Sequence, residues 1–515
     1  MNECVDRKEE RRIKEMQSRY DDEKEMEMEL FNACKDGKVE EVKTLLQNPQ
    51  INTNWKNQDY YHFTPFSIAC RNGHIDIVKL LLNDQRVDIN KARNHEETPF
   101  YSVCEKGHIE IVRLLLNDER VDINKANYDG KTPFSIACEK GHIEIVKLFL
   151  SDERTDINKA NEHHQIPLNI SCSKGHIEIV ELLLNDERVN SDINRANNNG
   201  ETPFYIACYS GHTEVVKLLL NDKRVDINKA KNNGKTSFWV TCQKGYIEIV
   251  KLLLNDKRVD VNKADSQCHE TPFYIACENG HIEIVKLLLN DQRVEDINRA
   301  NNSDETPFFI ACQNGHTEIV KLLLNDERVV IYIYAQADND DSWAPFYIAC
   351  YREHIEIVKL LLNDNRVDIN KADHDDGWTP LYVACWKGHL EIVKLFLNDN
   401  RIDINKENYA GETPFYIACW KEHLEIVELL LSDERVDLKG EGKILIETIR
   451  ERKKQKKQFW ESEEEHQKRQ TRWTKIIELL ESFERNPYET RTKLKIKLGF
   501  SGTFLQKKIF FSDDF

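Results

Sequence analysis

The sequence predicts an all-α solenoid of stacked helix-turn-helix repeats with hairpin fingers, followed by a helical, charged C-terminal tail. Three observations predict it: a proline recurs about every 34 residues, a cysteine recurs with the same period, and two short apolar segments lie between successive prolines. Ser237 takes the place of proline in one unit. The recurring prolines are Pro65, Pro99, Pro133, Pro167, Pro203, Pro272, Pro307, Pro345, Pro380 and Pro414.

A representative unit, residues 127–160, shows why each repeat forms two helices. Thr132 can cap the first helix by accepting backbone N–H groups, and Pro133 suits the first helical position because its missing N–H would have no partner there. Gly141 ends this helix, because glycine adopts the left-handed cap conformation without a Cβ penalty. The second helix is predicted at Ile143–Leu150.

The second helix is so apolar that neighbouring repeats must cover it. Only Glu144 and Lys147 interrupt its apolar surface, and this i,i+3 pair predicts one wet edge. Neither helix is long enough to persist alone in water, so stacking is obligatory. We count eleven such units after one degenerate unit that starts near Leu30, which gives about twelve repeats.

These segments resemble the ankyrin-repeat family across about residues 30–440. The T-P-F-x-I-A-C run matches the family's Thr-Pro-Leu-His-x-Ala-Ala helix, G-H-I-E-I-V-K-L-L-L matches its second helix, and D-I-N-K-A matches the segment that leads into the finger. The resemblance implies a curved array with fingers along one edge, whose concave face usually binds proteins.

The chain also departs from the family pattern. An N-D-x-R insertion lengthens the family's period of about 33 residues to about 34. The family's usual His after Thr-Pro-Leu is also replaced, so the resemblance leaves open which hydrogen bonds join neighbouring repeats. The replacing residues include Tyr101, Ser135, Asn169, Trp239 and Phe309.

Charge and composition predict three parts: a charged N-terminal helix or disordered extension (1–29), the repeat array (30–440) and a basic, helical C-terminal region (441–515). Residues 440–515 hold 18 Lys and Arg against 13 Asp and Glu, whereas the whole chain has a net charge of −17. No stretch approaches the roughly 18–20 apolar residues of a membrane span, and the N-terminus has no apolar signal core. We therefore expect a cytoplasmic location, with a nuclear one as the alternative because of the basic run at 450–457.

Recurring cysteines and histidines fill fixed structural positions. The cysteines are predicted to be small buried thiols, because equivalent positions in stacked repeats lie too far apart for a disulfide. The histidines stand at a Gly-His or Glu-His corner and lack a second ligand at i+3 or i+4, which favours a structural role over a metal site. The recurring cysteines are Cys34, Cys70, Cys104, Cys138, Cys172, Cys208, Cys242, Cys277, Cys312, Cys350, Cys385 and Cys419. The corner histidines are His74, His108, His142, His176, His212, His281, His316, His354, His389 and His423.

No catalytic motif stands out. Gly-Lys-Thr occurs at 130–132 and 234–236, but the upstream glycine of a phosphate loop is missing. We therefore predict no catalytic residue, no metal site and no cofactor. One irregular stretch, Val329–Tyr334 (VVIYIY), has two interpretations: a longer finger packed on the adjacent repeat, or a local bend or exposed edge strand.

The positions after the repeat cysteine change from polar to aromatic along the chain, as Arg71 and Glu105 give way to Tyr351 and Trp386. Tyr and Trp are common anchors of protein interfaces. Tyr347, Tyr382 and Tyr416 also fit a structural slot between repeats, whereas Trp386 and Trp420 are expected to be exposed. The predicted partner-binding residues are Trp343, Tyr347, Tyr351, Trp378, Tyr382, Trp386, Tyr409, Tyr416 and Trp420.

The leading hypothesis is a monomeric, non-enzymatic scaffold or adaptor that binds another protein, with no small-molecule substrate. Acidic fingertips beside the aromatic residues predict a partner segment with basic and apolar residues. The alternative hypothesis is attachment to nucleic acid or an anionic membrane through Arg450–Lys457 and Arg491–Lys497 in the tail. The fingertip acids are Asp338, Asp340, Asp341, Asp373, Asp375 and Asp376.

Overall fold

The computed structural model describes Arg12, Met16 and residues 24–189, 191–331, 344–438, 440–454 and 461–500. These residues form helices joined by turns, and the one β-bridge among them pairs Asn57 with Phe63. The predicted all-helical solenoid of repeats is confirmed. The chain divides into two compact units, Met1–Lys263 (unit 1) and Ala264–Phe515 (unit 2).

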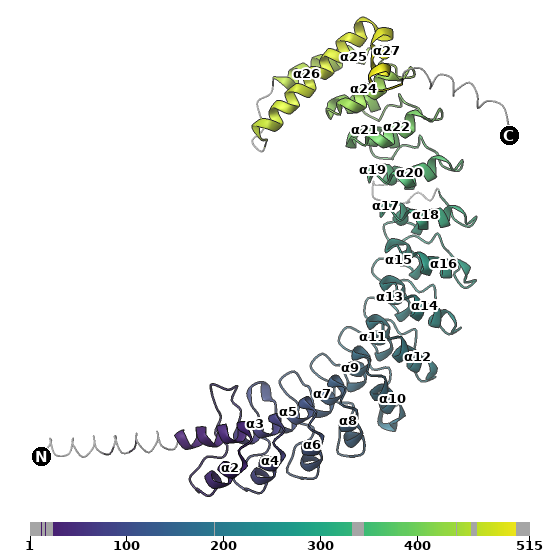
Figure 1. The fold of residues 1–515 in the computed structure, drawn as a ribbon. Helices are drawn as coiled ribbons and strands as arrows, with labels where there is room; N and C mark the ends of the chain where they lie inside the picture. The colour runs from purple at the N-terminus through teal and green to yellow at the C-terminus, as the bar shows by residue number, and fades with distance from the viewer. Residues whose placement is uncertain are drawn as a thin grey trace, which may run out of the picture. The chain divides into compact units, whose positions relative to one another are not determined.

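Unit 1 stacks its helices in pairs, and Figure 1 shows the first and second helices of the pairs in two adjacent rows. Residues 24–36 form the first helix. The others are α2 (Val39–Leu46), α3 (Pro65–Asn72), α4 (Ile75–Leu82), α5 (Pro99–Lys106), α6 (Ile109–Leu116), α7 (Pro133–Lys140), α8 (Ile143–Leu150), α9 (Pro167–Lys174), α10 (Ile177–Asn185), α11 (Pro203–Ser210), α12 (Thr213–Asn221), α13 (Ser237–Lys244) and α14 (Ile247–Leu254), with short 3-10 turns at Asn94–Glu96 and Glu187–Val189.

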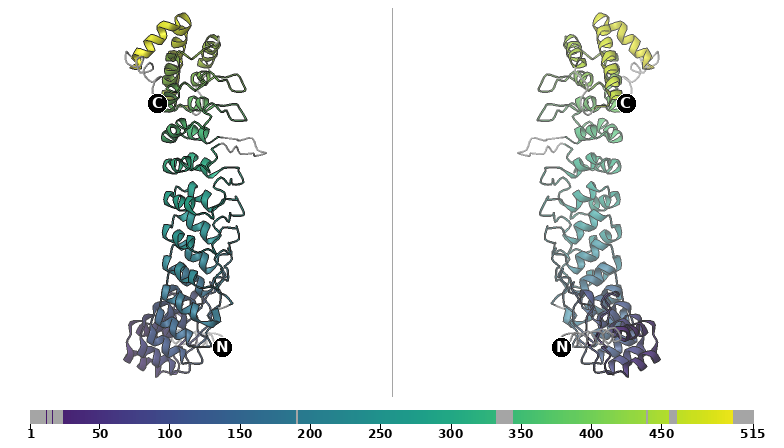
Figure 2. Two further views of the ribbon diagram at one scale, coloured as in Figure 1. Left: turned by 90° about the vertical axis from the view of Figure 1, so that its right-hand side faces the viewer. Right: turned by 90° about the vertical axis from the view of Figure 1, so that its left-hand side faces the viewer.

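Unit 2 continues the same pairing and ends in three longer helices. Figure 2 shows its connecting loops projecting to one side of the helix stack. Its paired helices are α15 (Pro272–Glu278), α16 (Ile282–Asn290), α17 (Pro307–Gln313), α18 (Thr317–Leu324), α19 (Pro345–Tyr351), α20 (Ile355–Leu362), α21 (Pro380–Lys387), α22 (Leu390–Leu397), α23 (Pro414–Trp420) and α24 (Leu424–Ser432). The tail helices are α25 (Glu441–Lys453), α26 (Glu463–Arg485) and α27 (Pro487–Lys497).

The representative repeat forms as its sequence predicts. Thr132 Oγ1 accepts the N–H of Ser135 at 3.1 Å, Pro133 opens α7, and Gly141 caps it with a φ of 77°. The second helix has the predicted bounds. Its wet edge is the ion pair of Lys147 and Glu144, whose nitrogen and oxygen lie 2.7 Å apart.

The recurring cysteines lie in the core of the stack, as predicted. All twelve are buried, and burial raises the pKa of the Cys104 thiol well above its usual value. A thiol held protonated in this way is a small apolar side chain that lets adjacent first helices pack closely.

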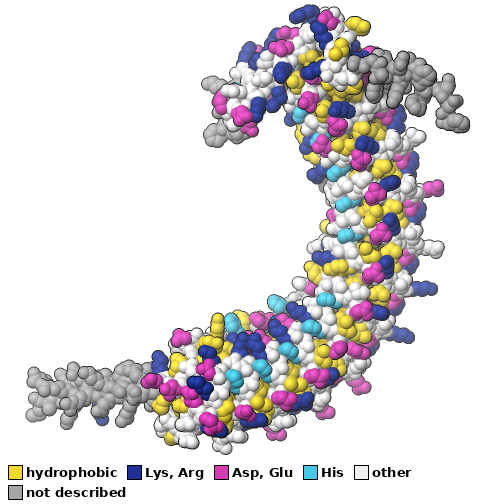
Figure 3. All heavy atoms as spheres, viewed as in Figure 1, with side chains coloured by type: hydrophobic (Ala, Val, Ile, Leu, Met, Phe, Trp, Pro, Cys, Tyr) yellow, Lys and Arg dark blue, Asp and Glu magenta, His cyan; other side chains and the backbone are white. Residues whose placement is uncertain are grey.

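Corner histidines tie most repeats to the preceding one. Nε2 of His142 lies 3.1 Å from the carbonyl oxygen of Glu105, and in unit 2 Nε2 of His354 lies 2.9 Å from that of Gln313. The acceptor in each such contact is the residue directly after the repeat cysteine. Figure 3 shows histidines, in cyan, recurring along the visible face of each unit. These contacts give the histidines the structural role that the sequence predicts, because each ring links one repeat to the main chain of another.

The Asp-x-Arg insertion forms a second link between repeats. Arg154 Nη2 donates to the carboxylate of Asp152 at 2.6 Å and to the carbonyl oxygen of Leu116, in the preceding repeat, at 2.7 Å. In unit 2, Arg435 Nη2 donates to the carbonyl oxygen of Leu397 at 2.7 Å. The residues that lengthen the family's period therefore supply part of the hydrogen bonding that joins the repeats.

Asparagine side chains and fingertip main chains complete the links. Asn124 Nδ2 donates to the carbonyl oxygen of Arg154 at 2.7 Å, and its Oδ1 accepts the N–H of Asp156 at 2.9 Å. At the fingertips, the N–H of Glu162 donates to the carbonyl oxygen of Asp129 at 3.1 Å. Neighbouring repeats are thus joined mainly through main-chain groups.

The described part of the irregular stretch keeps the normal repeat pattern. Val329 and Ile331 are each 5% exposed, like the Val and Ile of the usual V-D-I sequence, and Val330 donates its N–H to Asn298 Oδ1 at 2.8 Å. Residues 332–334 lie outside the described residues, so the choice between a longer finger and a local bend stays open. The domain boundaries at 29 and 440 also stay predictions.

The tail covers the second helix of the last repeat. Helix α26 buries Trp473, Ile476, Ile477, Leu480 and Phe483, the residues whose spacing predicts one apolar face. Helices α26 and α27 both pack on α24, so this helix does not face solvent as the outer helix of a free end would.

Basic residues of α27 hold this contact. Lys497 Nζ lies 2.5 Å from a carboxylate oxygen of Glu428, which is 9% exposed, and Lys495 Nζ lies 2.6 Å from one of Glu434. Arg491 Nη2 donates to the carbonyl oxygen of Val436 at 2.8 Å. The sequence suggests a basic surface at 491–497, but these three side chains instead bind the last repeat.

Candidate functional site

Three aromatic side chains of unit 2 form a continuous cluster, which we name the aromatic platform: Tyr351, Trp378 and Trp386. Tyr351 ends α19, Trp386 lies in α21, and Trp378 comes from the finger that precedes α21. The ring centroids of Tyr351 and Trp386 lie 6.1 Å apart, and those of Trp378 and Trp386 lie 5.2 Å apart. All three side chains are half-buried, so each keeps part of its ring surface in solvent.

Main-chain contacts fix the platform in place. His389 Nε2 lies 3.2 Å from the carbonyl oxygen of Tyr351, and His423 Nε2 lies 3.2 Å from that of Trp386. Burial lowers the pKa of His423, which favours its neutral form. The corner links therefore position two of the three platform residues before any partner arrives.

Two of the predicted site tyrosines lie beneath the surface. Tyr347 is 2% exposed and Tyr382 is 1% exposed, and burial raises the pKa of both phenols. The Tyr382 hydroxyl donates to Glu412 at 2.7 Å, while its ring lies 5.3 Å from that of Trp378. These residues fill the slot between repeats and support the platform from below.

Trp420 is covered by the tail. The Arg452 guanidinium lies 3.4 Å from its ring centroid, and Arg452 Nη1 donates to its carbonyl oxygen at 3.0 Å. Tyr416, which is half-buried, stacks on Trp420 with ring centroids 6.2 Å apart. The prediction that Trp386 and Trp420 are exposed is wrong: both are half-buried, because Trp386 packs against the other platform rings and Trp420 lies under α25.

The remaining predicted residues lie on fingers. Tyr409 is 70% exposed at a fingertip, where its N–H donates to the carbonyl oxygen of Asp376 at 2.8 Å. A fingertip tyrosine in this position can contact a partner that lies along the fingers. Trp343 and the acids Asp338, Asp340 and Asp341 fall outside the described residues.

Cationic side chains lie over the rings of the platform. Lys387 Nζ lies 3.9 Å from the ring centroid of Tyr351 and 4.5 Å from that of Trp386, and Lys421 Nζ lies 5.4 Å from that of Trp386. The Arg352 guanidinium lies 5.8 Å from the Tyr351 centroid. None of the three cations pairs with an acid among the described residues, so their charges are left for a ligand.

Several nearby acids have internal partners instead. The Asp373 carboxylate, which is 6% exposed, accepts the N–H of Trp378 at 2.8 Å, and burial raises its pKa. Glu353 lies 3.3 Å from His389 Nδ1. These acids hold a finger and a corner in position.

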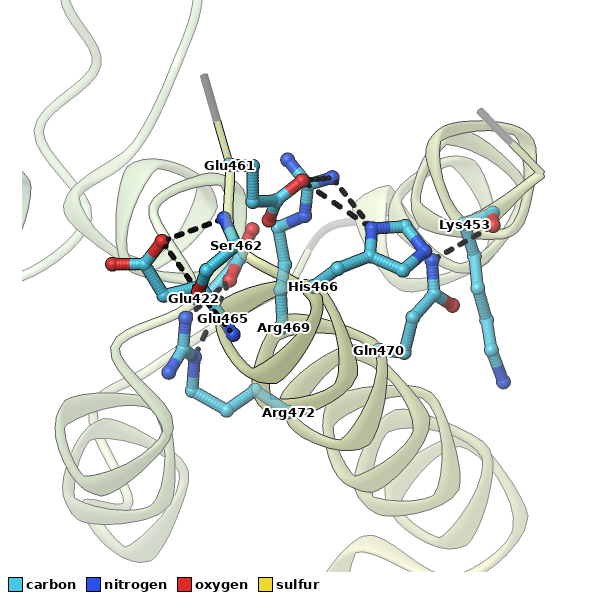
Figure 4. Close-up of polar contacts among 9 residues, drawn as sticks. All are labelled: Glu422, Lys453, Glu461, Ser462, Glu465, His466, Arg469, Gln470 and Arg472. Carbon is cyan, nitrogen blue, oxygen red and sulfur yellow. Dashed lines mark hydrogen bonds and ion pairs between the residues drawn. The ribbon is translucent and has the colours of Figure 1, made fainter. Parts of the chain in front are cut away.

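Figure 4 shows how the tail docks on the last repeat. Arg472 Nη2 pairs with Glu422 across a distance of 3.0 Å, which joins α26 to the corner after α23. On the same helix, Arg469 Nη2 pairs with Glu461 at 2.6 Å, and His466 Nδ1 lies 3.3 Å from the same carboxylate. This network fixes the end of α26 close to the covered Trp420.

Sequence reasoning missed the cations of the platform and the contact of Arg452. A signal for the lysines is present, because lysine directly follows the aromatic residue in both Trp386-Lys387 and Trp420-Lys421. No comparable signal marks Arg452, which lies in a charged helix and reaches Trp420 only through the docking of that helix.

Other kinds of site were sought across the described residues. No group of three or more His, Cys, Asp and Glu there is arranged to hold a metal ion. No helix in the described ranges is both long and apolar enough to cross a membrane.

Comparison with known proteins identifies the repeat. A family model described as ankyrin repeats, in three copies, matches overlapping stretches from residue 14 to residue 440. The search of curated proteins found no significant match. The matched stretches are 14–93, 85–161, 153–231, 223–301, 293–373, 325–408 and 346–440. Together with the paired helices, the capped corners and the fingers, this match shows that the chain belongs to the ankyrin-repeat family.

Proposed function

We propose that this chain is a non-enzymatic scaffold or adaptor that binds another protein through the aromatic platform and fingertips of residues 344–420. Ankyrin repeats are generally protein–protein interaction modules, which supports the class of function. The observation that supports the location is the platform itself: the Trp386 ring contacts both Tyr351 and Trp378, and each of the three side chains is partly open to solvent.

Two physical features support this location: the apolar surface of the rings, and the main chain that is already ordered beneath them. A half-open Trp or Tyr supplies a large apolar surface with a polar handle, and such residues dominate the free energy of many protein interfaces. Here the hydrogen bonds from His389 and His423 have already ordered the chain that carries the rings. A partner therefore loses less of its binding free energy to ordering the site. Tyr409 extends the same surface to the fingertips.

The finer features of this function follow from the sequence and belong to the same proposal. The chain acts as a monomer, in the cytoplasm or the nucleus, and uses no small-molecule substrate. The basic and apolar partner segment that the sequence predicts from six aspartates is not part of this proposal, and Asp338, Asp340 and Asp341 lie outside the described residues.

The alternative, attachment to nucleic acid or an anionic membrane through the tail, has less support. Arg452 and Lys453 of its basic run contact Trp420 and Thr474, and Lys495 and Lys497 pair with acids of the last repeat. A cation already paired in this way has less to gain from a phosphate. Residues 455–457 of the run lie outside the described residues.

Substitution of Trp386 tests the proposal. Trp386→Ala in the full chain should reduce the recovery of co-purifying proteins at least tenfold in affinity capture from an extract of the source cells, because it removes the central ring of the platform. Tyr209→Ala is the matched control, since Tyr209 also follows a repeat cysteine and is 48% exposed.

Helical circular dichroism should be unchanged in both variants. Equal recovery by the two variants and the unchanged chain would show that the partner binds elsewhere. A loss with Tyr209→Ala alone would move the site to unit 1.

A further inference from the structure

We infer that the segment received by the aromatic platform is an acidic peptide segment that also carries apolar residues. This inference rests on the proposed function and adds the chemistry of the partner. It reverses the charge that the fingertip aspartates suggest, and the reason is the distribution of unpaired charge around the rings.

The cations at the platform are uncompensated. Lys387 and Lys421 have their ammonium groups 3.9 Å and 5.4 Å from the nearest platform ring centroids, and neither pairs with an acid among the described residues. Arg352 is exposed and equally unpaired. Acidic side chains of a ligand can therefore approach these cations without breaking an existing ion pair.

The acids near the rings are less available. Asp373 is buried against the main chain of its own finger, Glu353 lies against His389, and Glu412 accepts the hydroxyl of Tyr382. Asp375 and Asp376 are exposed on the finger, but neither forms an ion pair with the platform cations. The charged groups that lie directly over the rings are cations, and the exposed acids stand beside them on the finger and at the corner.

The same lysines also define where the partner's acids must lie. An ammonium group over an aromatic face is attracted by the ring and loses some of its freedom. Lys387 lies over both Tyr351 and Trp386, so a carboxylate that reaches it comes close to both rings. An apolar side chain next to that carboxylate in the partner would then cover the open ring surface.

A peptide fits this surface better than a single-stranded nucleic acid. Stacking of bases requires open, roughly parallel ring faces. The rings of Tyr351 and Trp386 are tilted by 34° and those of Trp378 and Trp386 by 47°, and Lys387 lies over a face of the first pair. Flexible side chains with carboxylates can adapt to such tilted rings, whereas a stack of bases cannot.

The experiment measures binding of labelled peptides to the full chain by fluorescence anisotropy. Three peptides of equal length share a Trp-x-x-Leu core and differ only in flanks of Asp and Glu, Asn and Gln, or Lys and Arg. A labelled oligothymidylate of similar length is the fourth probe. The acidic peptide should bind roughly tenfold more tightly than the neutral one at low salt, and this difference should shrink as salt is added.

Variants then assign the effect to the platform. Lys387→Gln with Lys421→Gln should weaken binding of the acidic peptide roughly three- to tenfold and leave the neutral peptide unchanged. The matched control is Lys106→Gln with Lys140→Gln, which removes the same charge from equivalent positions in unit 1 and should change neither.

Equal affinity for the three peptides, tighter binding of the basic one, no binding of the acidic one, or tighter binding of the oligonucleotide would overturn this inference. The proposed function would still stand in each case if Trp386→Ala reduced partner capture. A failed capture experiment with a clear acidic preference would instead refute the scaffold assignment and leave the peptide chemistry intact.

Discussion

Unit 1 and unit 2 use the same repeat to present two different surfaces. In unit 1 the positions after the repeat cysteine are mostly charged and pair with neighbours: Arg71 Nη1 lies 3.1 Å from a Glu105 oxygen, and Lys131 Nζ lies 2.6 Å from one of Glu139. In unit 2 two of these positions hold Tyr351 and Trp386, and the cations over their rings pair with no acid among the described residues. Several charges of the row in unit 1 are thus paired within the repeats, whereas Lys387 and Lys421 in unit 2 lie over aromatic rings.

The difference teaches that the stack and the surface are specified by separate residues. The corner histidine, the Asp-x-Arg insertion and the asparagine links occur in both units with the same partners. None of them depends on the side chain that follows the repeat cysteine, because they meet its main chain or other positions. A change of surface therefore needs no change of fold.

The largest expected effect is unfolding in acid, which tests whether the two units depend on the same links between repeats. A hydrogen bond from the neighbouring arginine lowers the pKa of Asp118 and Asp152 in unit 1 and of Asp364 and Asp399 in unit 2. The folded pKa lies below the unfolded value of about 3.9. The ion pairs therefore stabilise the fold above that pH and are lost as the pH falls through the lowered pKa.

Both units should consequently unfold in one window that begins below about pH 4. Hydrogen–deuterium exchange at a series of pH values can follow the two separately. Opening of one unit well above pH 5 while the other stays protected would show that the shared links do not dominate.

Truncation of the side chains that follow the repeat cysteines should have the next largest effect on stability. Trp386→Ala should lower the free energy of unfolding by about 2 kcal/mol, since it removes a half-buried ring with two aromatic contacts. Glu105→Ala in the other row removes a partly exposed ion pair and should cost less than about 1 kcal/mol. Urea unfolding followed by circular dichroism measures both, and similar costs would mean that the platform is no better packed than the charged row.

The corners before the histidines offer a smaller and more local test. Gly107 has a φ of 81°, and a Cβ there would come within 2.7 Å of His142 Cε1. In unit 2, Glu353 occupies the equivalent corner with a φ of 63°. Gly107→Glu should destabilise unit 1 by about 1–2 kcal/mol, and Glu353→Gly should stabilise unit 2 by up to about 1 kcal/mol. If Glu353→Gly is destabilising, the contact of its carboxylate with His389 outweighs the backbone strain.

Much of the fold could be predicted from the sequence because it depends on local rules repeated many times. Thr132, Pro133 and Gly141 act within a few residues of their own position, and the apolar spacing from Trp473 to Phe483 is set by one helix. Recurrence then removes the ambiguity that a single copy would have. Residues 24–29 are helical, in a segment for which the sequence leaves open a charged helix or a disordered extension.

The site was harder to predict because it depends on contacts between distant residues. The exposure of Trp420 is decided by Arg452 in a docked helix, and that of Trp386 by rings from two other segments. The pattern predicts a segment and residue types for the partner site, and that location stays a prediction. It could not say which rings are buried and which are partly exposed, since the buried Tyr382 and the half-buried Trp386 are only four positions apart on α21.

The acceptors of the links between repeats are largely carbonyl oxygens, which every residue possesses. His142 therefore binds its neighbour equally well whether the preceding row position carries a glutamate, a serine or a tryptophan. A substitution in that row leaves these main-chain links in place, so an existing array could acquire a new specificity by a few surface exchanges. Unit 2 fits this description, because it keeps the links of unit 1 and carries aromatic residues at Tyr351 and Trp386.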